Sequence, residues 1–164
     1  MKKIAYSIFL FILLIFINGC AGYEPIFSST NLQFEIADYS IEGNKILGNK
    51  IYSKLYSLSK SKKDDQNLRS VDLVIKISKD KNATVKDSTG KILQYKITLN
   101  MDIKVTDFIT KDKILNQVFI SSITYKVQNK YSDTVNLENQ TIENLLNKTY
   151  QELVIKLAQN ITLK

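Results

Sequence analysis

The sequence predicts an α+β fold, a two-layer sandwich of about four mostly antiparallel strands covered on one face by two helices. Four segments alternate apolar and polar residues, which is typical of strands with one buried and one solvated face. Two other segments carry apolar residues at the spacing of an amphipathic helix. The order is strand, helix, three strands, helix, and helices packed on one side of such a sheet form a common two-layer domain.

The first strand is expected at residues 32–41, whose first half alternates apolar and polar residues. Residues 44–59 change to helical spacing. Their apolar stripe consists of Leu47, Ile51, Leu55 and Leu58. Asn44 is a candidate N-cap, and Gly48 should weaken the first turn by about 1 kcal/mol relative to alanine.

Three more strands are expected before the second helix. Residues 71–78 alternate, and residues 79–90 are predicted to be a turn region with only a short extended piece. Residues 93–105 give the clearest pattern, and such a strand would span about 40 Å. Its apolar face is formed by Leu93, Tyr95, Ile97, Leu99, Met101, Ile103 and Val105. Residues 119–127 continue this style and predict a hairpin with the third strand.

The last element is expected to be a helix over residues 135–163. Asn136, Glu138 and Glu143 supply an N-terminal signal, because polar and acidic side chains favour the first turns of a helix. The wide apolar stripe contains Ile142, Leu145, Leu146, Tyr150, Leu153, Leu157 and Ile161. Leu99 and Leu146 are therefore predicted to lie in the core, and Lys96 on the solvated face.

The first twenty residues predict export. A basic start at residues 1–3 precedes an apolar run, Ile4 to Ile17, of 14 residues. A membrane-spanning helix needs about 20 residues, so this layout is that of a signal peptide. We expect residues 1–19 to be a signal peptide, 20–31 a lipidated tether, and 32–164 a single α+β domain.

The end of the leader, Ile17-Asn18-Gly19-Cys20, resembles the lipobox of bacterial lipoproteins. That resemblance implies cleavage between Gly19 and Cys20, and a diacylglyceryl group on the Cys20 thiol. Three acyl chains would hold the protein on a bilayer, since one chain anchors only marginally. Ala21 in place of Asp implies sorting to the outer membrane, facing the periplasm. An uncleaved anchor or a buried cysteine is the alternative.

Composition excludes several classes of function. The formal net charge is +7, but it comes almost entirely from lysine in a chain rich in Ile and Asn, which also fits an AT-rich genome. Arginine clusters and aromatic-basic motifs are missing, so no nucleic-acid partner is expected. Without histidine, and with the one cysteine lipidated, the usual triads and zinc sites are excluded. We expect no enzyme, no metal and no cofactor.

The segment after the cysteine, Gly22-Tyr23-Glu24-Pro25-Ile26-Phe27, resembles the start of the outer-membrane lipopolysaccharide-assembly lipoprotein family (LptE), alphaproteobacterial type. The order of elements, the Tyr125-x-Val127 strand end followed by Tyr131, and the closing helix fit as well. The resemblance implies a protein that assists the assembly of, and plugs, a large outer-membrane β-barrel that inserts lipopolysaccharide into the outer leaflet. Barrel lumens are polar, which suits a polar sheet face.

The same resemblance implies contact with lipopolysaccharide. The candidates are Lys96, Lys104 and Lys126, which would pair with lipid A phosphates as point charges. For any single one of them, a plain solvated strand lysine is the favoured explanation. Two other functions stay open. One is a generic envelope lipoprotein serving another transport or secretion complex, and the other is an enzyme using carboxylates such as Glu35, Asp102 or Asp107.

Overall fold

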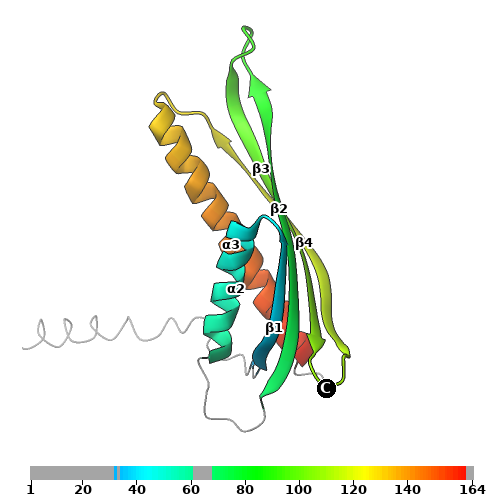
Figure 1. The fold of residues 1–164 in the computed structure, drawn as a ribbon. Coiled ribbons are helices and arrows are strands. Elements are labelled where there is room, and N and C mark those ends of the chain that lie inside the picture. The colour runs from blue at the N-terminus through cyan, green and yellow to red at the C-terminus, as the bar shows by residue number, and fades with distance from the viewer. Residues whose placement is uncertain (1–31, 33, 61–67, 162–164) are drawn as a thin grey trace, which may run out of the picture. The chain divides into compact units, whose positions relative to one another are not determined.

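The computed structural model describes residues 32, 34–60 and 68–161. These residues form a sheet and two helices in the predicted order β-α-β-β-β-α (Figure 1). The elements are β1 (Phe34–Gly43), α2 (Lys45–Lys60), β2 (Arg69–Lys86), β3 (Ile92–Asp107), β4 (Lys113–Lys126) and α3 (Tyr131–Ile161). The predicted α+β fold is confirmed.

The sheet has four strands in the order β1-β2-β3-β4. β2, β3 and β4 pair antiparallel through hairpins, whereas β1 and β2 are parallel. Parallel neighbours need a crossover connection, and α2 provides it. Figure 1 shows both helices on the same side of the sheet, so the other face of the sheet is left without a helix among the described elements.

Two glycines allow α2 to lie close to the sheet. Gly43 ends β1 at φ +77°, where a Cβ would lie 2.4 Å from the Ile77 carbonyl oxygen. Asn44 then caps the helix, since its Oδ1 accepts a hydrogen bond from the Leu47 amide at 3.2 Å, as predicted. At Gly48 a Cβ would lie 2.4 Å from Ile41 Cγ2. Gly48 therefore has a packing role that its low helix propensity did not indicate.

β2 is much longer than predicted, with 18 residues ending at Lys86. The prediction of a turn region over residues 79–90 was wrong for residues 79–86, which pair with β3 down to Lys86 and Ile92. Figure 1 shows this hairpin running past the helices. Because most side chains there are exposed on both faces, the segment has no apolar alternation. The turn itself, residues 87–90, closes through a hydrogen bond from the Gly90 amide to the Asp87 carbonyl oxygen.

The core lies between the sheet and the helices. Leu99 is 1% exposed and Leu146 is fully buried, whereas Lys96 is exposed, as predicted. The largest fully buried side chains are Phe34, Ile51, Leu55, Ile75, Ile77, Ile97, Leu99, Met101, Ile103, Leu145, Leu146 and Leu153. Helix α3 begins at Tyr131 rather than at residue 135. The sequence prediction missed this first turn because its side chains are mostly exposed and show no apolar period.

The leader lies outside the described residues, and so do Gly19, Cys20 and the boundary at residue 31. Cleavage and lipidation therefore stay predictions. Among the described residues, no helix combines the length and the apolar character that crossing a bilayer requires.

Candidate functional site

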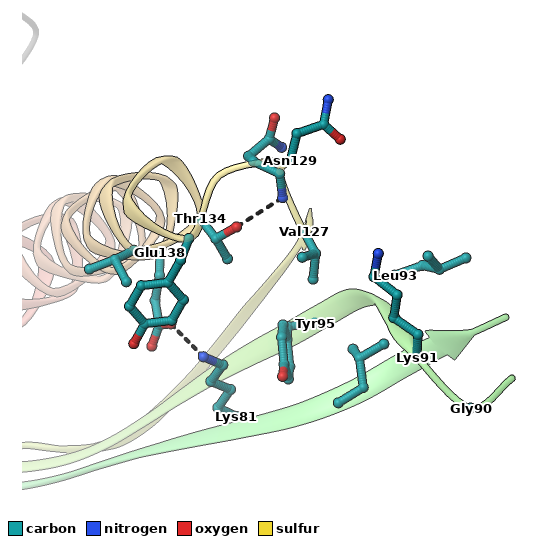
Figure 2. A pocket seen from close by; sticks show the side chains of 13 residues that line it. Lys81, Gly90, Lys91, Leu93, Tyr95, Val127, Asn129, Thr134 and Glu138 are labelled. Carbon is teal, nitrogen blue, oxygen red and sulfur yellow. Dashed lines mark hydrogen bonds and ion pairs between the residues drawn. The ribbon is translucent and has the colours of Figure 1, made fainter.

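A cleft of about 670 Å³ lies where the β2–β3 hairpin leaves the body of the domain and α3 begins (Figure 2). Three stretches of chain build it, namely the extended hairpin, residues 127–129 after β4, and the first two turns of α3. The lining side chains include Lys81, Lys91, Leu93, Tyr95, Val127, Tyr131, Thr134 and Glu138. The cleft depends on the long β2, because Lys81 lies in the part of that strand that the sequence did not reveal.

Backbone hydrogen bonds hold the connection between β4 and α3. The Val127 amide donates to the Leu93 carbonyl oxygen at 2.9 Å, which extends the β3–β4 ladder by one pair. The Gln128 amide donates to Thr134 Oγ1 at 2.9 Å, and this hydroxyl belongs to a buried side chain in the first turn of α3. The start of the helix is thereby tied to the end of the sheet, and the wall of the cleft is fixed.

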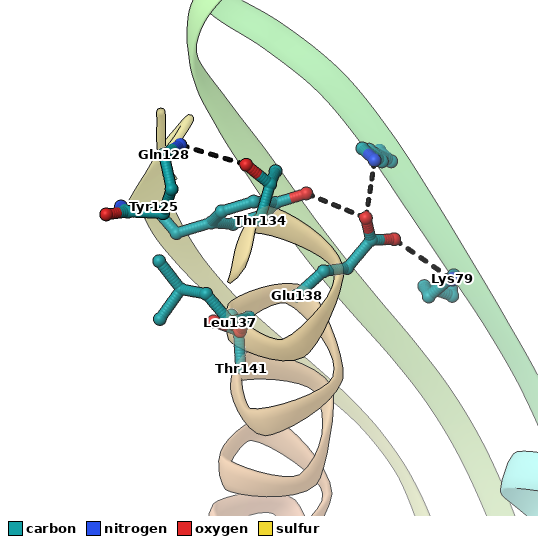
Figure 3. A network of polar contacts seen from close by, with 8 residues as sticks. Lys79, Tyr125, Gln128, Thr134, Leu137, Glu138 and Thr141 are labelled. Atoms are coloured by element: carbon teal, nitrogen blue, oxygen red, sulfur yellow. Dashed lines mark hydrogen bonds and ion pairs between the residues drawn. The ribbon is translucent and has the colours of Figure 1, made fainter. Parts of the chain in front are cut away.

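Glu138, which lines the cleft, is the centre of a polar network (Figure 3). Its Oε2 lies 2.5 Å from Lys81 Nζ and accepts a hydrogen bond from the Tyr125 hydroxyl at 2.9 Å. Its Oε1 lies 3.8 Å from Lys79 Nζ. One carboxylate from α3 thus joins two lysines of β2 and a tyrosine of β4.

Two aromatic rings form the floor beneath Lys81. Tyr95 and Tyr125 are directly paired across β3 and β4, and their ring centroids are 5.8 Å apart. Lys81 Nζ lies 4.3 Å from the Tyr95 centroid and 5.9 Å from that of Tyr125. A cation over an aromatic face is attracted by the ring quadrupole, so the rings and Glu138 together hold this ammonium group.

The electrostatics of the network keep Glu138 and Lys81 ionised. Burial by itself would raise the pKa of Glu138, but the hydrogen bonds from Lys81 and Tyr125 outweigh it and leave that pKa below its ordinary value. Burial would lower the pKa of Lys81, yet its bonds to Glu138 and Tyr125 leave that pKa above normal. Burial raises the pKa of Tyr125. Glu138 therefore stays an ionised carboxylate near neutral pH, unlike a general acid, whose pKa lies near the working pH.

The charges that surround the cleft favour an anionic amphiphile. Lys81 and Lys91 line the cleft together with Glu138, and Lys79 lies within 3.8 Å of that carboxylate. Leu93, Val127 and Tyr131 add apolar surface near them. Tyr131 is 84% exposed, so an aromatic ring is available at this end of the molecule. Among the described residues, no group of His, Cys, Asp and Glu is placed to hold a metal ion.

The three predicted lysines lie on the other face of the sheet and do not form one site. Lys96 is opposite Thr124, and Lys126 is opposite Gln94, so Lys96 and Lys126 are diagonal neighbours across β3 and β4, about 7–8 Å apart. Lys104 is eight residues further along β3, which is about 26 Å. All three side chains are exposed.

Sequence reasoning missed Lys81 as a site residue and saw in Glu138 only a helix-start signal. The available clue was Tyr95 and Tyr125, two bulky tyrosines on the apolar faces of strands predicted to form a hairpin. If these two rings pair across the strands, their faces can bind a cation, so a nearby lysine is the expected partner.

The carboxylates considered for an enzyme do not share a cavity among the described residues. Asp107 ends β3, where the Thr110 amide and Arg69 hold its pKa at about 2. Glu35 and Asp102 are exposed strand residues on β1 and β3. The carboxylate that lines the cleft is Glu138 instead.

The comparisons with known proteins concern the fold. No protein-family model matches the chain, and no curated protein matches its sequence significantly. The rare lipoprotein B from Shewanella oneidensis superposes with a TM-score of 0.54 at 14% identity, covering 77% of this chain and 98% of that one. A protein of Caulobacter crescentus CB15 classed as a lipoprotein gives 0.54 at 10% identity, covering 77% and 90%.

A third solved structure, lipoprotein B from Nitrosomonas europaea, gives a TM-score of 0.52 at 10% identity, covering 75% of this chain and 81% of that one. Identities this low establish a shared fold and nothing finer. The described domain therefore has the fold of these solved lipoproteins.

Proposed function

We propose that the protein is a non-enzymatic outer-membrane lipoprotein that assists the assembly of, and plugs, the β-barrel that inserts lipopolysaccharide into the outer leaflet. The observation that carries this proposal is the sheet face without a helix. On β3 it bears Gln94, Lys96, Thr98, Asn100, Asp102, Lys104 and Thr106, all polar and at least partly exposed. On β4 the same face also carries Val118 and Ile120, which are 53% and 69% exposed. The polar β3 part of the face suits the hydrated lumen of a large barrel, where an apolar plug would be poorly solvated.

The leader and the fold support the same proposal independently. The lipobox resemblance implies an acyl anchor at Cys20, and three solved structures that share the fold are lipoproteins by name. An anchored domain on the inner side of the outer membrane would meet a barrel there from the periplasm.

Contact with lipopolysaccharide is assigned to the end of the sheet that carries the β2–β3 hairpin. Lys96 and Lys126 lie on one face at this end, and the cleft lined by Lys81 and Lys91 lies on the other, with Lys79 beside it. Lysines can pair with lipid A phosphates as point charges, and the cleft adds aromatic and apolar surface for the same ligand. Lys104 is too far along β3 to belong to this end.

Depletion of the protein in its own cells tests the proposal. The partner barrel should fail to reach its mature form, and lipopolysaccharide should be lost from the surface. Cells complemented with Lys104→Ala serve as the control, because one solvated lysine away from the proposed lipopolysaccharide contact contributes little to a large polar interface. Normal barrel maturation and normal surface lipopolysaccharide after depletion would contradict the proposal.

A pull-down from detergent-solubilised membranes separates the proposal from the generic alternative. Recovery of a very large outer-membrane β-barrel supports the assembly role. Recovery of the subunits of another transport or secretion complex, with no such barrel, would favour a generic envelope lipoprotein.

A further inference from the structure

The turn between β3 and β4 presents two apolar side chains to solvent. Phe108 is 44% exposed and Ile109 is 82% exposed. The other hairpin turn of the sheet, residues 87–90, consists of Asp, Ser, Thr and Gly, the residues that turns normally use. An apolar turn at one end of the domain and a polar turn at the other end therefore require different explanations.

The apolar turn is held rigidly by Asp107. Its Oδ1 accepts the amides of Ile109 and Thr110, each at 2.9 Å, and its Oδ2 lies 2.7 Å from Arg69 Nε. The Phe108 amide also donates to the Ser70 carbonyl oxygen at 2.9 Å. The exposure of Phe108 and Ile109 is thus a property of an ordered turn, since neighbouring backbone groups are bonded on both sides of it.

This turn lies at the end of the domain where the chain enters the sheet. Phe34 at the start of β1 pairs with Arg69, and Asp107 pairs with Val71 two residues further along β2. β1 and β3 are separated by one strand, so they lie about 10 Å apart. Figure 1 shows the β3–β4 turn and the start of β1 at the same end of the sheet, and the polar β2–β3 turn at the opposite end.

The length of chain before the sheet sets the reach of the predicted anchor. Twelve residues, 20–31, precede Leu32, and an extended chain of that length spans at most about 40 Å. We propose that Phe108 and Ile109 form a second membrane contact, inserting into the headgroup–acyl boundary of the bilayer that carries the acyl group of Cys20. This inference rests on the anchor in the proposed function and concerns the lipoprotein before it joins a barrel.

The charges of the turn identify the apolar boundary, rather than an anionic lipid surface, as the occupant. Asp107 is paired with Arg69, and Lys111 Nζ lies 2.9 Å from Asp72 Oδ2. Asp112 and Lys113 remain and cancel each other formally. Lys111 Nζ also lies 4.5 Å from the Phe108 ring centroid, on a stem that can keep its charge in water while the ring is buried. Two apolar side chains hold a bilayer weakly by themselves, but a covalent anchor supplies the effective concentration that makes such a contact persist.

Single-tryptophan variants test the contact, because the natural chain contains no tryptophan. Ile109→Trp places the reporter in the apolar turn, and Ser88→Trp is the matched control in the exposed turn at the opposite end. The full chain is purified from membranes and reconstituted into phosphatidylethanolamine–phosphatidylglycerol vesicles without other proteins. Emission is recorded with brominated acyl chains and with aqueous acrylamide as quenchers.

The proposal expects a blue-shifted emission from Ile109→Trp that brominated lipid quenches and acrylamide does not. Ser88→Trp should show the opposite behaviour. Equal access of acrylamide to both reporters in membrane-bound protein would overturn the inference while leaving the anchor intact. Intact mass reports acylation separately. If Cys20 proves unmodified, its thiol is coupled to a maleimide lipid and the same comparison decides whether the turn inserts.

Discussion

Asp107 shows how one buried side chain organises a turn. Hydrogen bonds from the Thr110 amide and from Arg69 hold its pKa at about 2, against an ordinary value of 3.8. Since the folded-state pKa is depressed, ionised Asp107 stabilises the fold fully above pH 3.8, and this contribution is lost as the pH falls toward 2. Arg69, the chain's one arginine, has a structural role here.

Asp107→Asn is therefore expected to lower the free energy of unfolding most above about pH 4, with a difference from the natural chain that shrinks as the pH approaches 2. Denaturant titrations of both chains between pH 7 and pH 2 measure this. If the difference in unfolding free energy stays constant over the whole range, these bonds do not lower the pKa of the Asp107 carboxyl.

Glu138 likewise joins several elements through one carboxylate in the wall of the cleft. Because α3 begins at Tyr131, Glu138 lies beyond the first turn, where the helix dipole acts most strongly. Its side chain instead bonds Lys81 and Tyr125 from two strands. Its role in the cleft follows from those partners, and the two lysines of β2 leave the site positively charged despite it.

At the scale of the elements, α2 packs on the sheet through Gly48. Alanine in its place gains about 1 kcal/mol of helix propensity, but a Cβ there would lie 2.4 Å from Ile41 Cγ2. Because overpacking typically costs about 1–3 kcal/mol, we expect Gly48→Ala to destabilise the domain. Asn49→Ala, at an exposed neighbouring position, should be neutral or stabilising.

A double-mutant cycle with Ile41→Ala identifies the cause, because that change removes the methyl group the new Cβ would meet. The two substitutions should couple favourably by about 0.5–3 kcal/mol in chemical denaturation. Strictly additive effects would show that Gly48 matters for the helix backbone and not for its contact with β1.

The layer between the sheet and the helices is filled by buried apolar side chains. Leu99 and Leu146 are both at most 1% exposed and come from the sheet and from α3. Leu99→Ala or Leu146→Ala should each cost about 2–5 kcal/mol of unfolding free energy. Lys96→Ala, on the solvated face, should change it by less than about 0.5 kcal/mol. If Lys96→Ala proved costlier than either leucine substitution, the assignment of faces would be inverted.

At the scale of the whole molecule, the predicted anchor determines where the domain works. Cys20→Ser should leave an uncleaved precursor or release the protein into the periplasm, because the hydroxyl cannot receive the thioether-linked lipid. Membrane fractionation and intact-mass analysis of both chains measure this. An unmodified N-terminus at a residue other than Cys20 in the natural chain would contradict it.

We propose different partners for the two ends of the domain. The end with Phe108 and Ile109 faces the bilayer in our proposal, and the end with the cleft and the β2–β3 hairpin is available to lipopolysaccharide. The sheet face without a helix runs between them and is assigned to the barrel. The barrel role and the bilayer contact are tested by separate experiments, so one of these two proposals can fail without the other.

Much of the architecture could be predicted from the sequence, because burial leaves a period in the chain. The sheet buries one face of β3 and the helices bury one stripe, so residues 93–105 and 142–161 carry patterns of period 2 and 3.6. Asn44 was also predictable, since capping depends on one side chain and the adjacent amide.

The tertiary structure alone decided the rest. Residues 79–86 of β2 are held by backbone pairing with side chains exposed on both faces, so no apolar pattern marks them. The parallel placement of β1 beside β2 depends on the path of α2, and Gly48 is required by a contact with Ile41 on another element. The cleft joins Lys81 and Glu138, 57 residues apart, because an ion pair depends on where the fold brings two charges together and leaves no local signal in either segment.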